Sequence, residues 1–180
     1  MSRPDRHGSA AAGGVVPLNA RQPPAEPPVP GLEHLARFQV HLDRPPWDLG
    51  RPTELGNRRI VPITGGAFNG PRLTGQILDQ GADWQVVTDA GTTVVDTRYL
   101  LRTDDGALIF LSTRGFRDGP RQVLAALAAG DPVDPATYYF RITLTFETGD
   151  ERYRWLNTVV AIGSALRTPT TVVYDAYLVT

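Results

Sequence analysis

The fold class is indicated most clearly by one segment, Tyr138-Tyr139-Phe140-Arg141-Ile142-Thr143-Leu144-Thr145-Phe146-Glu147. Large apolar side chains alternate in it with mostly polar ones, and a period of two is that of a β-strand whose two faces meet different surroundings. We therefore predict a strand near residues 137–147. One face carries Tyr138, Phe140, Ile142, Leu144 and Phe146, and the other carries Tyr139, Arg141, Thr143, Thr145 and Glu147.

Runs rich in β-branched and aromatic residues recur on both sides of this strand, separated by turn signals. Asp89-Ala90-Gly91 and Asp104-Asp105-Gly106 have the composition of tight hairpin turns. Residues 32–42 fit either a strand or a short helix. Further strands are predicted near residues 58–64, 66–79, 82–88, 92–103, 106–113, 153–164 and 171–179.

One segment departs from the β pattern. Asp118-Gly119-Pro120 places a proline where the first turn of a helix accepts it, and Gly130 is a typical helix end. Between them, Val123, Leu124 and Leu127 form a small apolar stripe at helical spacing. The sequence predicts one short α-helix at about 119–129.

Many consecutive short strands with hairpin signals and a single helix are typical of an all-β barrel or sandwich. A barrel is favoured because closure removes the exposed strand edges that so many strands would otherwise present. We predict one domain over residues 32–180, a closed or nearly closed antiparallel β-barrel of the lipocalin-like or calycin-like kind.

The N-terminal residues have a different composition. Seven of the sixteen prolines fall within residues 1–30, with alanine and glycine between them. Such a stretch has too little apolar surface to form a core. Residues 1–31 are predicted to be a disordered, proline-rich tail.

Composition excludes several function classes. All eighteen basic residues are arginine, so Schiff-base chemistry on lysine is excluded, and the absence of cysteine excludes thiol nucleophiles and disulfides. A net charge of −1 gives no reason to expect nucleic acid or an anionic membrane as a partner. No apolar run approaches the roughly 20 residues of a membrane span. A cytoplasmic location is expected.

Seven segments mix glycine, aromatic and charged residues in a characteristic order. They are Thr64-Gly65-Gly66-Ala67-Phe68-Asn69-Gly70-Pro71, Gly81-Ala82-Asp83-Trp84, Asp96-Thr97-Arg98-Tyr99, Thr103-Asp104-Asp105-Gly106-Ala107, Tyr139-Phe140-Arg141, Phe146-Glu147-Thr148-Gly149 and Tyr153-Arg154-Trp155-Leu156-Asn157. Taken together, these segments resemble the family known as domain of unknown function 3237. The resemblance covers roughly residues 33–180 and implies a small β-barrel, but it implies little about activity.

The polar residues among these segments are the candidate site. They mix aromatic rings with ionisable groups and amides, as ligand pockets do. We expect the polar strand faces, including the face of Arg141 and Glu147, to line the barrel interior. The alternative is that these faces are the solvated outside, where Asp96 and Arg98 would be a surface ion pair worth under about 1 kcal/mol.

A mechanism follows if these side chains converge. Catalytic roles fall to Asp83 or Glu147, which would shuttle a proton, and to Arg98, which would stabilise an enolate or carboxylate, with Arg141 as its alternative. Substrate binding would fall to Trp84, Asp96, Tyr99, Arg141, Trp155 and Asn157. No cofactor is needed, and no metal site is expected because His34 and His41 would need carboxylates brought from elsewhere.

The resulting hypothesis is a cofactor-independent isomerase, cyclase or lyase acting on a small carbonyl-containing metabolite in natural-product biosynthesis. The alternatives are a non-catalytic barrel that binds a hydrophobic small molecule and a structural module without a cavity. A polar interior would also turn the apolar face of residues 138–146 outward. A second subunit would then cover it, so a homodimer is expected.

Overall fold

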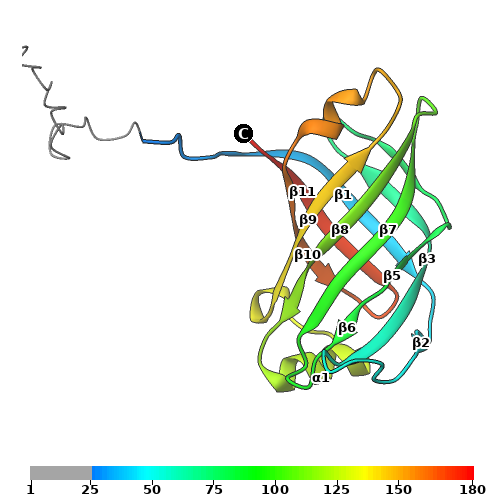
Figure 1. Ribbon diagram of the computed structural model, residues 1–180, viewed down its shortest axis with the longest axis vertical. Helices are drawn as coiled ribbons and strands as arrows, with labels where there is room; N and C mark the ends of the chain where they lie inside the picture. Colours follow the sequence, from blue (N-terminus) through cyan, green and yellow to red (C-terminus); the bar gives the residue numbers. More distant parts are fainter. Residues whose placement is uncertain (1–25) are drawn as a thin grey trace, which may run out of the picture.

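A computed structural model of the chain describes residues 26–180, of which Leu32–Val179 build a barrel (Figure 1). The predicted tail therefore falls almost entirely outside the described residues. The long strands are β1 (Leu32–Leu42), β3 (Asn57–Asn69), β7 (Thr93–Thr103), β8 (Leu108–Asp118), β9 (Tyr139–Glu147), β10 (Ala161–Arg167) and β11 (Thr171–Val179). The short strands are β2 (Trp47–Asp48), β4 (Gly75–Ile77), β5 (Gly81–Asp83) and β6 (Val86–Val87).

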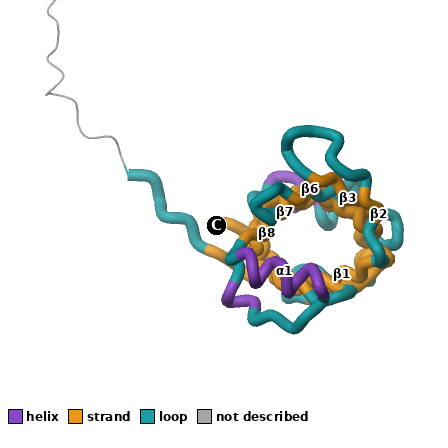
Figure 2. The backbone as a smooth tube through the Cα atoms, turned by 90° about the horizontal axis from the view of Figure 1, so that it is seen from below, coloured by secondary structure: helices purple, strands orange, loops and turns teal. Residues whose placement is uncertain are grey.

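The strands form one closed antiparallel sheet. Its order is β1-β11-β10-β9-β8-β7, then β4, then β3, and a further β1–β3 pairing closes the ring (Figure 2). The short strands β5 and β6 also lie between β3 and β7, so β4, β5 and β6 together occupy one strand position. The barrel therefore has eight strand positions. The predicted all-β antiparallel barrel with one short α-helix is confirmed.

The segment at 66–88 is more broken than predicted. After β3 the chain turns and returns as three short strands beside β7. At Gly75 the backbone has a φ of +153°, and a Cβ atom there would lie 2.2 Å from the carbonyl oxygen of Arg102. Only glycine permits this close approach, which is the kind of bend that barrels place at glycine.

Helical segments lie at the two ends of the barrel. The α-helix α1 (Arg121–Ala129) lies below it and ends at Gly130 in the left-handed conformation, as the sequence predicts. The 3₁₀ helix η2 (Pro135–Thr137) precedes β9. At the upper end lies η3 (Arg154–Thr158), where a strand was predicted, so that prediction is wrong for residues 154–158.

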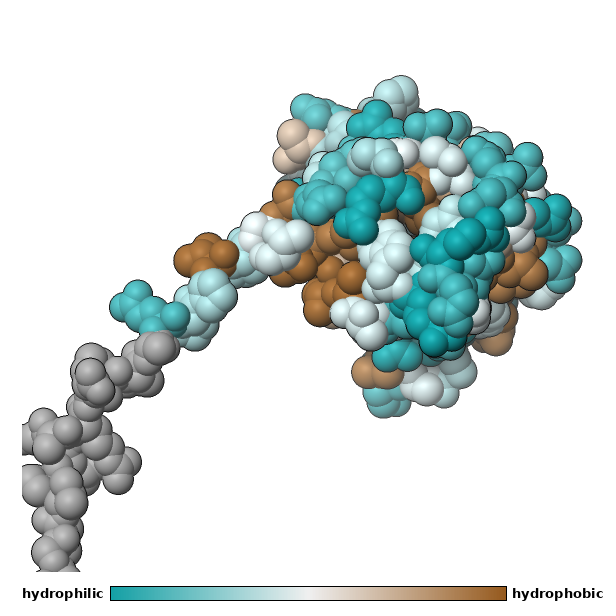
Figure 3. All heavy atoms as spheres, turned by 90° about the horizontal axis from the view of Figure 1, so that it is seen from above, coloured by the Kyte–Doolittle hydropathy of each residue, from teal (hydrophilic) through white to brown (hydrophobic). Residues whose placement is uncertain are grey.

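The upper end of the barrel is filled by apolar side chains. Leu35, Leu73 and Leu156 are almost fully buried there. Further in, the ring of Phe38 stacks between Phe68 and Tyr174, with centroid distances of 5.3 and 4.7 Å. Figure 3, a view from above, shows mainly hydrophilic residues over this end, with hydrophobic ones beside the entry to β1. The core therefore occupies the upper half.

The face of β9 that points into the barrel is the opposite of the one predicted. Phe140, Ile142, Leu144 and Phe146 are buried, whereas the alternate residues from Tyr139 to Glu147 are exposed. The apolar face fills the interior because a barrel of eight strands is only wide enough for side chains or one small ligand. The argument for a homodimer loses its premise, since no long apolar face of β9 is left uncovered. No helix in the described part of the chain has the length and apolar character to span a membrane.

Candidate active site

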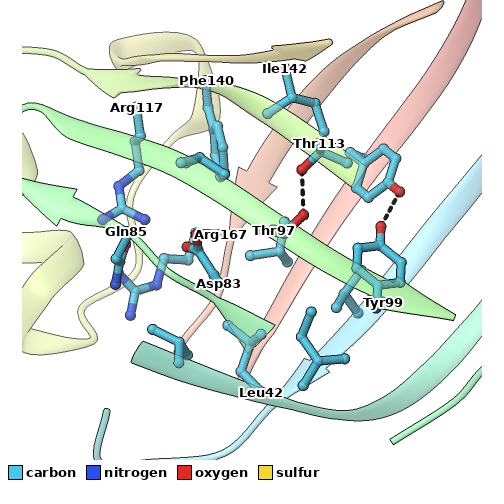
Figure 4. A pocket seen from close by; sticks show the side chains of 16 residues that line it. Leu42, Asp83, Gln85, Thr97, Tyr99, Thr113, Arg117, Phe140, Ile142 and Arg167 are labelled. Carbon is cyan, nitrogen blue, oxygen red and sulfur yellow. Dashed lines mark hydrogen bonds between the residues drawn. The ribbon is translucent and has the colours of Figure 1, made fainter. Parts of the chain in front are cut away.

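A cavity occupies the lower half of the barrel interior, and Figure 4 shows the side chains that line it. The empty space between these side chains is about 560 Å³ when open solvent at the mouth is counted, and the enclosed part is much smaller. Small binding sites are commonly apolar with a few polar groups pointing inward, and this cavity has that character. The apolar lining comes from Val40, Leu42, Val61, Ile63, Val95, Phe140, Ile142 and Val172, and the polar lining from Asp83, Gln85, Thr97, Tyr99, Thr113, Arg117, Arg167 and Tyr174.

Asp83 is the acidic group of this cavity. It ends β5, where it pairs with Val61 on one side and with Thr97 on the other. One carboxylate oxygen accepts a hydrogen bond from the backbone N–H of Asp96 at 3.1 Å. Burial raises the pKa of Asp83 to about 6, outweighing the opposing effect of that hydrogen bond and of the nearby Arg117. A carboxyl with this pKa can both give and take a proton near neutral pH.

Two arginines enter the cavity from its lower end. Arg117 lies near the end of β8 and donates a hydrogen bond to the Thr93 hydroxyl at 2.9 Å. Arg167 ends β10, and burial together with the positive charge of Arg117 lowers its pKa to about 9. It stays protonated at neutral pH. Figure 4 shows both guanidiniums beside Gln85 and Asp83 at one end of the cavity.

A pair of tyrosines marks the deeper part of the cavity. The hydroxyls of Tyr99 on β7 and Tyr174 on β11 are hydrogen-bonded to each other, and both residues are buried. Burial raises the pKa of both phenols, so both keep their protons. The bond uses one of the two hydroxyl hydrogens, which leaves the other to be donated to a ligand.

The register of β7 sets the spacing between the acid and the tyrosines. Asp83 pairs with Thr97, and Tyr99 follows two residues later on the same inward face. Two residues along a strand span roughly 7 Å. The Thr97 hydroxyl fills the interval and lies 2.5 Å from that of Thr113. Asp83 and the tyrosines therefore line the same cavity with Thr97 between them.

Of the nine residues predicted for the site, the structure brings only Asp83 and Tyr99 together in this cavity. Asp96 and Arg98 have the opposite parity to Tyr99 on β7, so they point outward. There Asp96 lies 3.3 Å from Arg98 and 3.6 Å from Arg114, and the Arg98 guanidinium lies 5.4 Å from the ring centroid of Trp84. The expectation that these three line the interior is wrong, and the surface ion pair is the correct alternative.

Arg141 and Glu147 are also outside. Arg141 lies on the exposed face of β9, with its guanidinium 5.4 Å from the ring centroid of Tyr139. Glu147, at the end of the same face, is exposed and lines a surface hollow to which Arg98 also contributes. Both predictions of a lumenal position are wrong because the other face of β9 supplies the core.

Trp155 and Asn157 lie on η3, at the opposite end from the cavity mouth. The ring of Trp155 packs against the Arg72 guanidinium, 4.0 Å from its centroid. The Asn157 amide accepts from the Thr148 backbone N–H at 2.9 Å and donates to its carbonyl at 2.8 Å. These two residues shape a loop, and the structure does not place them near the ligand cavity.

Sequence reasoning missed Arg117, Arg167 and Tyr174. The predicted strands near 106–113 and 153–164 both stop short of the arginines, whereas β8 runs to Asp118 and β10 to Arg167. The alternation of side chains along each strand could have identified the two arginines. Arg117 continues the face of Ile109 and Leu111, and Arg167 continues that of Ala161 and Ala165, so a polar residue at the end of an apolar face marks the cavity.

Outer-face variants provide a direct check on this reassignment. Arg141→Gln and Glu147→Gln are expected to change the free energy of unfolding by no more than about 0.5 kcal/mol, because both side chains are exposed. Urea unfolding at pH 7 measures this. A loss of several kcal/mol in either variant would show that the outer face of β9 is covered in solution.

The described residues contain no group of three His, Cys, Asp or Glu side chains that could hold a metal ion. The cavity therefore offers acid–base groups and cations rather than a cluster of metal ligands. What the arrangement can do chemically is transfer a proton at Asp83 and stabilise negative charge at the tyrosines or arginines.

Comparison with known proteins agrees with this barrel. A beta-barrel like protein from Acinetobacter baumannii is 54% identical, with a TM-score of 0.77 over 86% of this chain and 99% of that one. A UPF0311 protein from Rhodopseudomonas palustris is 41% identical over 124 residues, which are 69% of this chain and 81% of the relative. The hydroalkoxylation enzyme phnH from Penicillium herquei is 28% identical over 162 residues, 87% of this chain and 85% of the relative.

The match to a family model is nearly complete for the folded part. It covers residues 30–179, which include every strand of the barrel. The chain belongs to the family described as Protein of unknown function (DUF3237).

Proposed function

We propose that the barrel interior is the active site of an acid–base enzyme that adds an alcohol or phenol O–H group across a carbon–carbon double bond conjugated to a carbonyl, or removes it. The observation that carries the proposal is a buried carboxyl on β5 with a pKa of about 6, which lines the same cavity as a hydrogen-bonded tyrosine pair on β7 and β11. Such an enzyme is a cyclase when the hydroxyl and the double bond belong to one molecule.

The addition divides into two proton transfers. The Asp83 carboxylate takes the hydroxyl proton as the oxygen forms its bond to the β-carbon, and the electrons of the double bond move to the carbonyl oxygen, giving an enolate. The protonated Asp83 then returns the proton to the α-carbon, and the carbonyl re-forms. Atoms and charge balance without another reactant, and elimination is the same sequence reversed.

The tyrosine pair is placed to stabilise the enolate. A free phenol hydrogen donates to the carbonyl oxygen and gains strength as negative charge develops there, in surroundings that exclude water. Both phenols stay protonated because burial holds their pKa values above the ordinary 10. The apolar walls fold the substrate so that its hydroxyl lies near its double bond, which reduces the entropy cost of ring closure.

A relative supports this reaction class. Hydroalkoxylation, the activity in the name of phnH, is the addition of an O–H group to a carbon–carbon double bond. That relative comes from a fungus and shares 28% of its residues with this chain over most of both lengths. We extend the reaction class, and natural-product metabolites as its substrates, to this chain as part of the proposal.

A non-catalytic carrier of an apolar ligand is the second candidate. Half of the cavity-lining residues are apolar, which favours retention of a hydrophobic molecule. A carrier has no use for a buried ionisable carboxyl, which costs stability at neutral pH. The contribution of Asp83 to turnover therefore distinguishes the enzyme from the carrier.

Turnover of 2′-hydroxychalcone, a phenol that closes onto its own enone, tests the proposal. We expect the wild type to accelerate loss of the chalcone absorbance, Asp83→Asn to lose at least about 100-fold of that rate, and the outer-face control Arg141→Gln to match the wild type. Binding of the chalcone is followed in parallel by fluorescence titration. Binding to the wild type without turnover, or equal rates in the wild type and Asp83→Asn, would favour the carrier.

A further inference from the structure

A second hollow adjoins the lower mouth of the cavity. We call it the vestibule. The β1–β3 connection, the β6–β7 hairpin and α1 surround it, and it shares Gln85, Arg117 and Arg167 with the cavity above. Figure 2, a view from below, shows α1 crossing this end of the barrel. A ligand that enters from below therefore passes the vestibule before it reaches Asp83.

Positive charge is concentrated in the vestibule. Its lining has five arginines, Arg44, Arg59, Arg117, Arg121 and Arg167, against the two carboxylates of Asp48 and Asp89, whereas the whole chain has a net charge of −1. A hollow lined by one sign of charge attracts ligands of the other sign.

The two carboxylates already have partners. Asp48 accepts from the Asn57 amide at 2.9 Å and from Arg59 at 3.2 Å. Asp89 is held by Arg51, which lies outside the lining, with N–O distances of 2.6 and 3.0 Å. Neither acid is free to neutralise Arg44, and the carboxyl whose charge acts on Arg117 and Arg167 is Asp83 in the cavity above.

Two guanidinium nitrogens at this junction are buried without a partner. Arg44 Nη2 and Arg167 Nε have no hydrogen-bond acceptor among residues 26–180. A buried charged donor left unpaired is costly, and most buried polar groups in proteins are paired. Burial is the main cause that lowers the pKa of Arg167, and the positive charges of Arg117 and Arg44 lower it further. A bound oxyanion would contact the guanidinium atoms of these arginines that line the hollow, and its negative charge would offset this repulsion.

We propose that the substrate is an organic acid: its carboxylate, or another oxyanion of the same shape, is held by Arg44 and Arg167 in the vestibule, and its apolar body extends into the cavity. The planar guanidinium fork suits such oxyanions. Calling this ligand the substrate rests on the proposed function, because Asp83 and the tyrosines lie further along the same path. The ligand chemistry itself rests on the arginines alone.

Isothermal titration calorimetry with matched probes tests the inference without any turnover. The probes are 4-propylbenzoate, the uncharged 4-propylbenzamide of the same shape, and inorganic phosphate. We expect the benzoate to bind at least 10-fold more tightly than either other probe, and added NaCl to weaken it. Arg167→Met and Arg44→Met are each expected to lose at least 10-fold in benzoate affinity, while Arg141→Gln binds as the wild type does.

Three results would overturn the inference. Equal affinity for benzoate and benzamide would show that the site does not recognise an anion. Phosphate binding as tight as that of benzoate would show that the apolar body of the ligand contributes nothing. Unchanged benzoate binding in both arginine variants, each shown to be folded by circular dichroism, would show that Arg44 and Arg167 do not hold the anion. Asp83→Asn is expected to bind benzoate at least as tightly as the wild type. Because 2′-hydroxychalcone carries no carboxylate, its turnover tests only the reaction at Asp83 and the tyrosines, and its failure with this pattern intact would count against that reaction and not against the anion site.

Discussion

Asp83→Asn is expected to remove at least 99% of the turnover and, at the same time, to make the protein more stable above pH 6. The activity falls because an amide cannot carry the proton between the hydroxyl and the α-carbon. The stability rises because the buried carboxylate is costly once it ionises. An amide of the same shape still accepts the hydrogen bond from the Asp96 backbone N–H.

The pH window of the stability effect follows from two pKa values. Asp83 has a pKa of about 6 in the folded protein, against about 3.9 for aspartate in an unfolded chain. Below about pH 4 both states hold the proton. Between about pH 4 and 6 the folded state holds more protons than the unfolded state, so the free energy of unfolding falls as the pH rises, by no more than about 3 kcal/mol. The Asn variant lacks this decline.

Urea unfolding of the wild type and Asp83→Asn at pH 4.5 and pH 7.5 measures the effect. The variant should gain stability relative to the wild type on going to the higher pH. Asp79→Asn, at an exposed position, serves as the matched control and should show no such gain. A constant difference between the wild type and Asp83→Asn at both pH values would mean that Asp83 ionises as freely in the barrel as in the unfolded chain, and its role as a proton carrier would lose its basis.

The alternation of β9 shows what the sequence could and could not predict. A period of two assigns each residue of the strand to one of two faces, and this was sufficient to predict a β-barrel. It does not state which face is inside. The hydrophobic effect places the face of Phe140 and Ile142 inside, but the polar residues of the family resemblance suggested the reverse. In the structure, Asp96 and Arg98 form an outer ion pair, and Asn157 makes hydrogen bonds within a loop.

The site itself depends on where strands end in three dimensions. Arg117 and Arg167 are 50 residues apart in the sequence, and they meet because β8 and β10 finish at the same end of the barrel with the same inward parity. Strand ends are the least reliable feature of a prediction from sequence. Asp83 and Tyr99 could be identified because their residue types mark them, whereas their convergence needs the β5–β7 register.

The tyrosine pair should show a large and unequal loss of activity when its hydroxyls are removed one at a time. Only one of the two phenols can donate to the ligand while the other donates to it, since each has a single hydrogen. Removal of the donor that faces the ligand is expected to lower kcat by about 100- to 1,000-fold. Removal of its partner should cost less, because the first phenol can still reach the carbonyl.

A double-mutant cycle of Tyr99→Phe and Tyr174→Phe measures both the catalytic and the structural side. In kcat, the double variant should resemble the worse single variant, because the two hydroxyls act as one unit. In urea unfolding the order is different. Each single variant leaves one buried hydroxyl without its partner and should lose about 1–3 kcal/mol, whereas the double variant removes both and should regain part of that loss. Additive effects in both measurements would mean that the two phenols do not function through the hydrogen bond that joins them in the barrel.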